Sequence, residues 1–86
     1  MNQIEKMAVV KRLQNQIRYM NRIRRDEVQW PKEASVFQGM TMILAAMDVY
    51  VSCDMKFSGG TCVSRAMVLF PGDTEPLKIF DNAMEG

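Results

Sequence analysis

The chain of 86 residues contains no histidine, only two cysteines and only three prolines. Without histidine it has no Ser-His-Asp or Cys-His catalytic arrangement, and it lacks the side chain whose unperturbed pKa lies near neutrality. Its carboxylates are scattered, and no spacing among them suggests a paired general acid and base. We therefore expect a protein that is not an enzyme, with no catalytic residues and no cofactor.

Long hydrophobic runs are also absent. The most apolar segment, 36–47, is interrupted by Gln38, Gly39 and Thr41, and it is shorter than the roughly 20 residues that a membrane-spanning helix needs. Residues 1–25 carry charges throughout and contain no apolar stretch typical of a secretory signal. These observations predict a cytoplasmic protein without a membrane-associated segment.

The first part of the chain, residues 1–28, has the pattern of a long amphipathic helix. No Gly or Pro interrupts it, and its apolar residues recur with a period of 3.6. The arc that we expect to face the core or a second copy of the chain is centred on Leu13, Ile17 and Met20. A helix of about 24 residues would be roughly 36 Å long, whereas strands of about nine residues span roughly 30 Å. This difference favours self-association, with another copy covering part of the apolar arc.

A second helix is expected over residues 35–47. Trp30-Pro31 predicts a break, because proline disfavours helical geometry in the residue before it. Ser35 and Gln38 then have the spacing of a capping box. Gly39 weakens the helix by about 1 kcal/mol relative to Ala, and a strand over 40–46 is the competing interpretation.

Alternating apolar residues from Val49 onward predict a β-meander over 49–80, followed by a tail over 81–86. Ser58-Gly59-Gly60-Thr61 is typical of a hairpin turn. With Gly59-Gly60 as the two-residue turn, the pairs across the hairpin are Phe57 with Cys62, Lys56 with Val63, Asp54 with Arg65 and Cys53 with Ala66. Together with the helices, this pattern predicts a single α+β domain over 1–86.

The same register separates the two cysteines. Cys53 and Cys62 would lie roughly 13 Å apart along the strands, whereas a disulfide requires Cα atoms within about 7 Å. Two thiols are also too few for a structural zinc site, which normally has four ligands. We therefore expect free thiols and no metal.

Charge is distributed unevenly along a chain whose net charge is only +1. Residues 1–25 contain seven Lys or Arg and one Glu, which gives +6, so residues 26–86 sum to −5. The residues that we expect to contact an anionic partner are Lys11, Arg18, Arg22 and Arg25. A solvated helix face would be equally polar, and pairing of this basic segment with the acidic part of another copy is a further alternative.

These features favour a small interaction protein that self-associates and binds a partner protein with an anionic surface, acting as an inhibitor, adaptor or sequestering module. Binding of nucleic acid through the basic helix face is an alternative, although no known nucleic-acid motif accompanies it. Binding of a small anionic metabolite or nucleotide by an oligomer is another.

Overall fold

The computed structural model describes residues 1–57 and 59–85 and shows two helices followed by a three-stranded antiparallel sheet. The elements, in chain order, are α1 (Gln3–Arg22), α2 (Gln29–Ala46), β1 (Tyr50–Lys56), β2 (Cys62–Leu69), β3 (Leu77–Asp81) and the short 3-10 helix η1 (Asn82–Met84). The α+β prediction is therefore confirmed, and residues 40–46 are helical.

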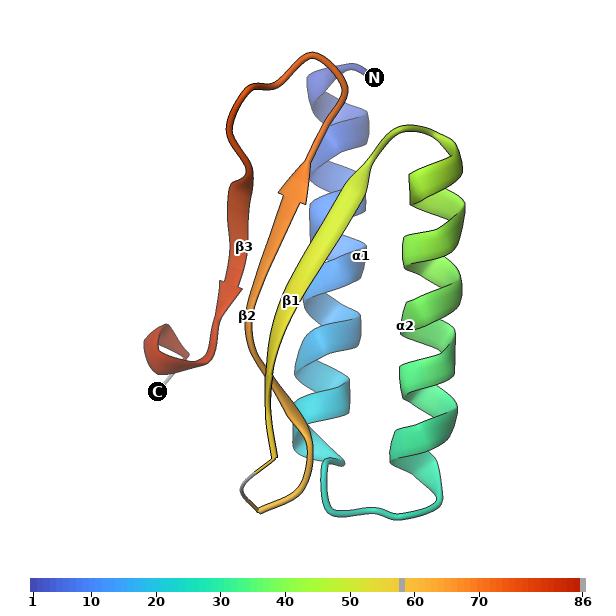
Figure 1. Ribbon diagram of the computed structural model, residues 1–86, viewed down its shortest axis with the longest axis vertical. Coiled ribbons are helices and arrows are strands. Elements are labelled where there is room, and N and C mark those ends of the chain that lie inside the picture. The colour runs from blue at the N-terminus through green and yellow to red at the C-terminus, as the bar shows by residue number, and fades with distance from the viewer. Residues whose placement is uncertain (58, 86) are drawn as a thin grey trace.

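Both helices cover the same face of the sheet and run antiparallel to each other (Figure 1). The strand order is β1-β2-β3. α1 contacts β2 and β3, whereas α2 contacts β1 and α1. This arrangement leaves α1 in the middle of the molecule and α2 at its side.

The core lies between α1 and the sheet. Leu13 and Ile17 are completely buried and Met20 is 2% exposed, and all three pack against apolar side chains of the strands. The apolar face of α1 is thus covered within one chain. The structure therefore supports packing, not contact with a second copy, as the role of these three residues.

α1 ends at Arg22, earlier than predicted. Its 20 residues give a length of about 30 Å, whereas the eight residues of β2, the longest strand, span about 26 Å. The helix still outreaches the strands by a few ångström, but Leu13, Ile17 and Met20 are buried within one chain, so its length alone does not argue for a second copy on α1. Arg24 and Arg25 lie in the connection to α2. Helix propensity in 23–25 is overridden there by the turn that leads to the second helix.

The predicted start of α2 is also wrong. The helix begins at Gln29, and Pro31 occupies its first turn, where the missing N–H has no intrahelical partner to lose. The Asp26 carboxylate accepts hydrogen bonds from the N–H groups of Val28 and Gln29 at 3.0 and 2.9 Å. Ser35 is not a cap: its hydroxyl donates to the carbonyl of Pro31 at 3.0 Å.

The sheet register is confirmed in its middle and wrong near the hairpin turn. Asp54 pairs with Arg65 and Cys53 with Ala66, as predicted. A bulge between Asp54 and Met55 then shifts the remaining pairs, so that Met55 faces Val63 and Lys56 faces Cys62. Gly59 and Gly60 both have positive φ, as the predicted turn requires, and Ser58 lies outside the described residues.

Cys53 and Cys62 are free, as predicted. The residues after Phe80 are more ordered than a tail: β3 extends to Asp81, whose carboxylate caps η1 by accepting from the Ala83 N–H at 3.1 Å. The predicted tail also included Gly86, which is outside the described residues. No helix in 1–57 or 59–85 is long and apolar enough to cross a membrane.

Candidate functional site

The outward face of α1 carries three of the four basic residues that the sequence indicated. Lys11, Arg18 and Arg22 are exposed there. Arg25 lies beyond the helix, where its Nε donates to the carbonyl of Gly59 at 3.2 Å. The four residues therefore do not form one site, and only Arg18 and Arg22 line the same hollow.

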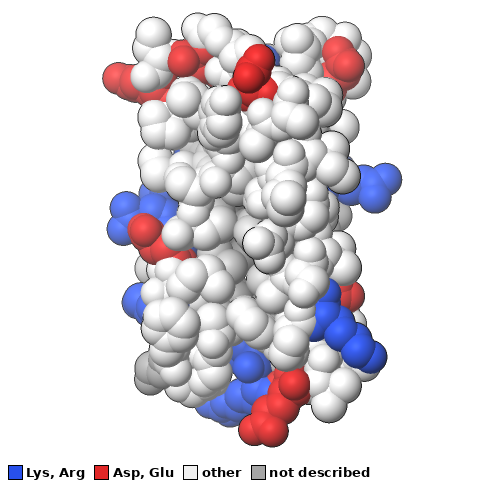
Figure 2. All heavy atoms as spheres, turned by 45° about the vertical axis from the view of Figure 1, so that its right-hand side comes forward, with Lys and Arg blue, Asp and Glu red and all other residues white. Residues whose placement is uncertain are grey.

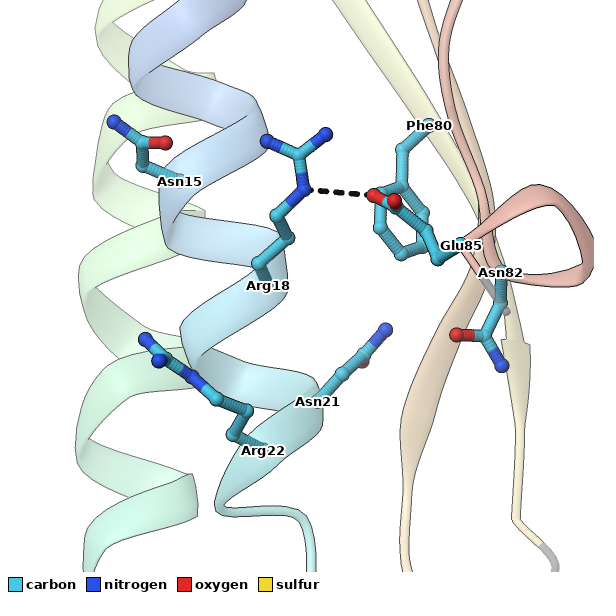
Figure 3. A pocket seen from close by; sticks show the side chains of 7 residues that line it. All are labelled: Asn15, Arg18, Asn21, Arg22, Phe80, Asn82 and Glu85. Atoms are coloured by element: carbon cyan, nitrogen blue, oxygen red, sulfur yellow. Dashed lines mark hydrogen bonds and ion pairs between the residues drawn. The ribbon is translucent and has the colours of Figure 1, made fainter.

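That hollow is a cleft of about 500 Å³ between α1 and the C-terminal segment. Its lining residues are Asn15, Arg18, Asn21 and Arg22 from α1, Phe80 from β3, and Asn82 and Glu85 from the C-terminal segment. Figure 3 shows the helix residues on one side and the C-terminal residues on the other. The ring of Phe80 is buried, so polar groups surround an apolar base.

One ion pair crosses the cleft. The Nε of Arg18 donates to Oε1 of Glu85 at 2.7 Å (Figure 3). A distance this short is typical of a charge-assisted hydrogen bond. The side chains of Arg18 and Glu85 remain 47% and 37% exposed, so solvent screens the pair and its contribution to stability is small. The Glu85 carboxylate thus binds Arg18 through a solvent-exposed contact, from which another carboxylate could displace it.

Arg22 is the second arginine that lines the cleft, although Figure 3 shows its guanidinium turned away from Glu85. Its guanidinium lies over the ring of Tyr19, 5.7 Å from the centroid, and it makes no ion pair with any residue in 1–57 or 59–85. A cation over an aromatic face is held in place without losing its charge. The cleft therefore has one arginine paired with Glu85 and a second whose guanidinium must move away from Tyr19 to reach a ligand beside Arg18.

No protein-family model, curated protein or solved structure matches this chain.

Hydrogen bonds to the strands hold α1, which forms one wall of the cleft. Asn21 bridges to the backbone of Val63, donating to its carbonyl at 2.9 Å and accepting from its N–H at 2.8 Å. About two turns earlier in α1, Gln14 donates to the carbonyl of Ile79 at 2.7 Å. These bonds attach α1 to β2 and β3 on either side of Arg18. The wall that carries Arg18 and Arg22 is therefore rigid.

The opposite wall is held by Asp81. Its carboxylate accepts from the N–H of Ala83 and pairs with Lys78 at 3.3 Å. The hydrogen bond from Ala83, followed by Lys78, lowers the pKa of Asp81. The segment that carries Asn82 and Glu85 is therefore capped, and it folds back toward α1.

Lys11 lines a different hollow, of about 820 Å³, between the first half of α1 and the β2–β3 connection. There the cations face acids: Lys6 pairs with Asp73 at 3.7 Å, and Glu75 also lines the hollow. This mixture of charges makes the larger hollow a weaker anion site than the cleft. Among the described residues, no three His, Cys, Asp or Glu side chains gather as metal ligands.

Five residues that line the cleft were not predicted from the sequence: Asn15, Asn21, Phe80, Asn82 and Glu85. Asn15 lies between Arg12 and Arg18 in the predicted helix, and this position among basic residues was the signal that could have identified it. Glu85 is 67 positions from Arg18 along the chain and belongs to a segment expected to be a tail. No local pattern connects the two, because their contact depends on how β3 and η1 fold back.

Proposed function

We propose that the protein is a small non-enzymatic binding module whose cleft receives a carboxylate side chain from an acidic segment of a partner protein. The observation that carries this proposal is the Glu85 carboxylate on Arg18, in a cleft that Arg22 also lines. Glu85 occupies the position that a partner's carboxylate would take. Binding in this way would let the module inhibit, recruit or sequester its partner.

The distribution of charge favours an acidic protein segment over a nucleic acid. Two basic residues of α1 are paired with acids, Lys6 with Asp73 and Arg18 with Glu85. A nucleic-acid surface gains affinity from many contiguous cations that release counterions from phosphates. A cleft with two arginines, amide side chains and an apolar base suits a single carboxylate better.

The proposal predicts that Glu85 competes with the partner. Fluorescence anisotropy with a labelled Glu-rich peptide measures this directly, with a single-stranded and a duplex oligonucleotide of equal charge as comparison probes. Glu85→Gln is expected to bind the peptide severalfold more tightly than the natural chain, because the neutral amide pairs less strongly with Arg18.

Arginine variants test whether the cleft is the binding site. Arg18→Gln and Arg22→Gln are each expected to weaken peptide binding about tenfold, since a charge-assisted hydrogen bond contributes roughly 1.5–3 kcal/mol. Arg12→Gln is the matched control, because Arg12 lies on the same helix and is exposed but does not line the cleft. Equal weakening by all three variants would contradict the proposal.

The comparison probes distinguish the alternatives. Tighter binding of an oligonucleotide, with affinity that falls steeply as salt increases, would support nucleic-acid binding through α1 instead. An increase in melting temperature with a nucleotide but not with the peptide would support a small anionic ligand. A location in the reducing cytoplasm, which we also propose, is supported by the two free thiols.

A further inference from the structure

Part of the apolar surface of α2 is not covered by the rest of the molecule. Residues 34–47 contain no charged side chain, and none of the residues of α2 is fully buried. Four large apolar side chains on this helix and its C-terminal end are each more than half exposed: Val36, Met42 and Ile43 in α2, and Met47 at the C-cap. A helix that is hydrophobic all round is normally buried, so one side of α2 lacks a cover.

We call this side the α2 face and define it by the outward residues of the helix, which are Val36, Gly39, Met42, Ile43, Ala46 and Met47. Figure 2 shows a broad uncharged surface along the length of the molecule, with charged side chains at its edges and ends. Beside this face, a groove of about 290 Å³ runs between α2 and α1, lined by apolar residues and Arg12. A Cβ added at Gly39 would meet nothing within 4 Å, so another backbone can approach closely there.

The chain exposes more surface than a folded monomer of its mass is expected to expose, and this excess is about the area that one partner buries in a protein interface. A folded monomer of 9.9 kDa is expected to expose about 5,200 Å². This chain exposes 5919 Å². The excess of about 700 Å² is close to the roughly 800 Å² that each partner buries in a standard protein interface.

Charge at the two ends of the molecule is complementary. The end formed by the start of α1, the α2–β1 turn and the β2–β3 connection carries four acids and one lysine, namely Glu5, Lys6, Asp48, Asp73 and Glu75. The other end, formed by the α1–α2 connection, the first residues of α2 and the hairpin, carries Arg24, Arg25, Lys32 and Lys56 with Asp26, Glu27 and Glu33. Four cations and three acids give this end +1, whereas one lysine and four acids give the first end −3. In Figure 2, acidic side chains dominate at the top, whereas the lower half shows basic side chains together with acidic ones.

We propose that a second copy of this chain covers the α2 face, with the two α2 helices packed antiparallel about a two-fold axis. A two-fold interface brings the same patch of each subunit together, and the antiparallel arrangement places the acidic end of one copy beside the basic end of the other. The face itself carries no charge that would be buried. α2 contributes no residue to the cleft, so this proposal and the proposed function can fail independently.

Light scattering coupled to size-exclusion chromatography tests the interface. The natural chain is expected to form a dimer at tens of micromolar. Ile43→Lys places a charge in the centre of the α2 face and is expected to raise the dissociation constant at least tenfold, because a symmetric dimer carries each substitution twice. Leu77→Lys is the matched control: Leu77 is 52% exposed but lies on β3, outside the α2 face, and its variant is expected to remain dimeric.

A monomer at several hundred micromolar would overturn the proposal. So would a dimer that survives Ile43→Lys but dissociates in Leu77→Lys. Far-UV circular dichroism distinguishes loss of the dimer from loss of the fold, because Ile43 is 67% exposed and its replacement leaves the core of the monomer intact.

Cross-linking tests the orientation. Ser35→Cys and Ala46→Cys place thiols near opposite ends of the α2 face, and a short bismaleimide tolerates an uncertainty of one or two residues in register. An antiparallel dimer is expected to cross-link mainly between the two variants when they are mixed. Cross-linking of each variant only to itself would show a parallel arrangement and overturn the antiparallel geometry proposed. The natural chain is the control, since Cys62 is buried and Cys53 only partly accessible.

Discussion

Gly60 shows how a single backbone position joins the hairpin to the end of α1. Its φ is +95°, and a Cβ there would lie 2.5 Å from the carbonyl oxygen of Arg24. Gly72 has a similar φ of +86°, but a Cβ there would meet nothing within 4 Å. A substitution at Gly72 therefore introduces backbone strain alone, whereas one at Gly60 introduces the same strain together with a steric clash.

We expect Gly72→Ala to lower the free energy of unfolding by about 1–2 kcal/mol, the cost of left-handed geometry in a residue with a Cβ. Gly60→Ala is expected to cost clearly more, since the clash adds to the same strain. Urea denaturation of both variants measures the difference. Equal losses would show that the Arg24 carbonyl moves aside at little cost.

Cys53 gives a second prediction at the scale of one residue. Burial, with a smaller contribution from Asp54, raises the pKa of the Cys53 thiol to about 11. The folded chain therefore holds this proton more tightly than the unfolded chain. The resulting stabilisation is fully present below about pH 8.5, the ordinary thiol pKa, and is lost as pH rises toward 11.

Chemical denaturation at a series of pH values between 8 and 11 measures this dependence. Tyrosine and lysine titrate in the same range, so the natural chain is compared with Cys53→Ala. The variant is expected to show a shallower loss of stability with increasing pH. Identical slopes would mean that the thiol titrates normally in the folded protein.

The connection between the two helices depends on one carboxylate. Asp26 accepts the N–H groups of Gln29 and Val28, and these hydrogen bonds lower its pKa. A lowered pKa stabilises the fold at pH values above the ordinary carboxyl value near 4. This stabilisation is lost as pH falls through the lower pKa of the folded state.

Two substitutions separate the hydrogen bonds of Asp26 from its charge. Asp26→Ala removes the acceptor and is expected to lower the melting temperature at pH 7. Asp26→Asn keeps an acceptor, so it is expected to lose less at pH 7 and to show a weaker dependence on pH below 5. Thermal unfolding from pH 2.5 to 7 provides the comparison, and an unchanged melting temperature in Asp26→Ala would show that α2 begins without this cap.

Sequence periodicity was sufficient for α1, the strands and the middle of the hairpin register, because each of these follows from residues close together in the chain. The helix ends were not predictable in this way. Pro31 indicated a break because proline is unfavourable in helix interiors, yet in the first turn of α2 it costs nothing. Asp26, whose carboxylate accepts the N–H groups of Val28 and Gln29 just before the helix, was the stronger local signal.

The cleft could be predicted only in part for a related reason. Arg18 and Arg22 were visible because they share a helix face, four residues apart. Glu85 reaches them only after Asp81 caps η1 and turns the chain back. Such a contact depends on the tertiary structure, and it cannot be predicted from the spacing of apolar residues along the chain.

At the scale of the whole molecule, the two helices contribute unequally to stability. α1 contributes three fully buried side chains, whereas α2 contributes none. The chain therefore consists of a firmly packed unit, α1 with the sheet, and a helix attached to its side. Segments with few buried apolar contacts open locally at low free energy. Because α2 has no fully buried side chain, we expect it to open in this way in a monomer.

Hydrogen exchange followed by NMR tests this inequality together with the proposed dimer. In dilute solution, where the monomer dominates, the amides of α2 are expected to exchange faster than those of α1 and β2. As protein concentration increases, protection in α2 is expected to increase because a second copy covers its apolar face, while protection in α1 changes little. Ile43→Lys should abolish the concentration dependence without altering the exchange of α1. Protection of α2 equal to that of α1 in the monomer would instead show that both helices open only when the whole molecule unfolds.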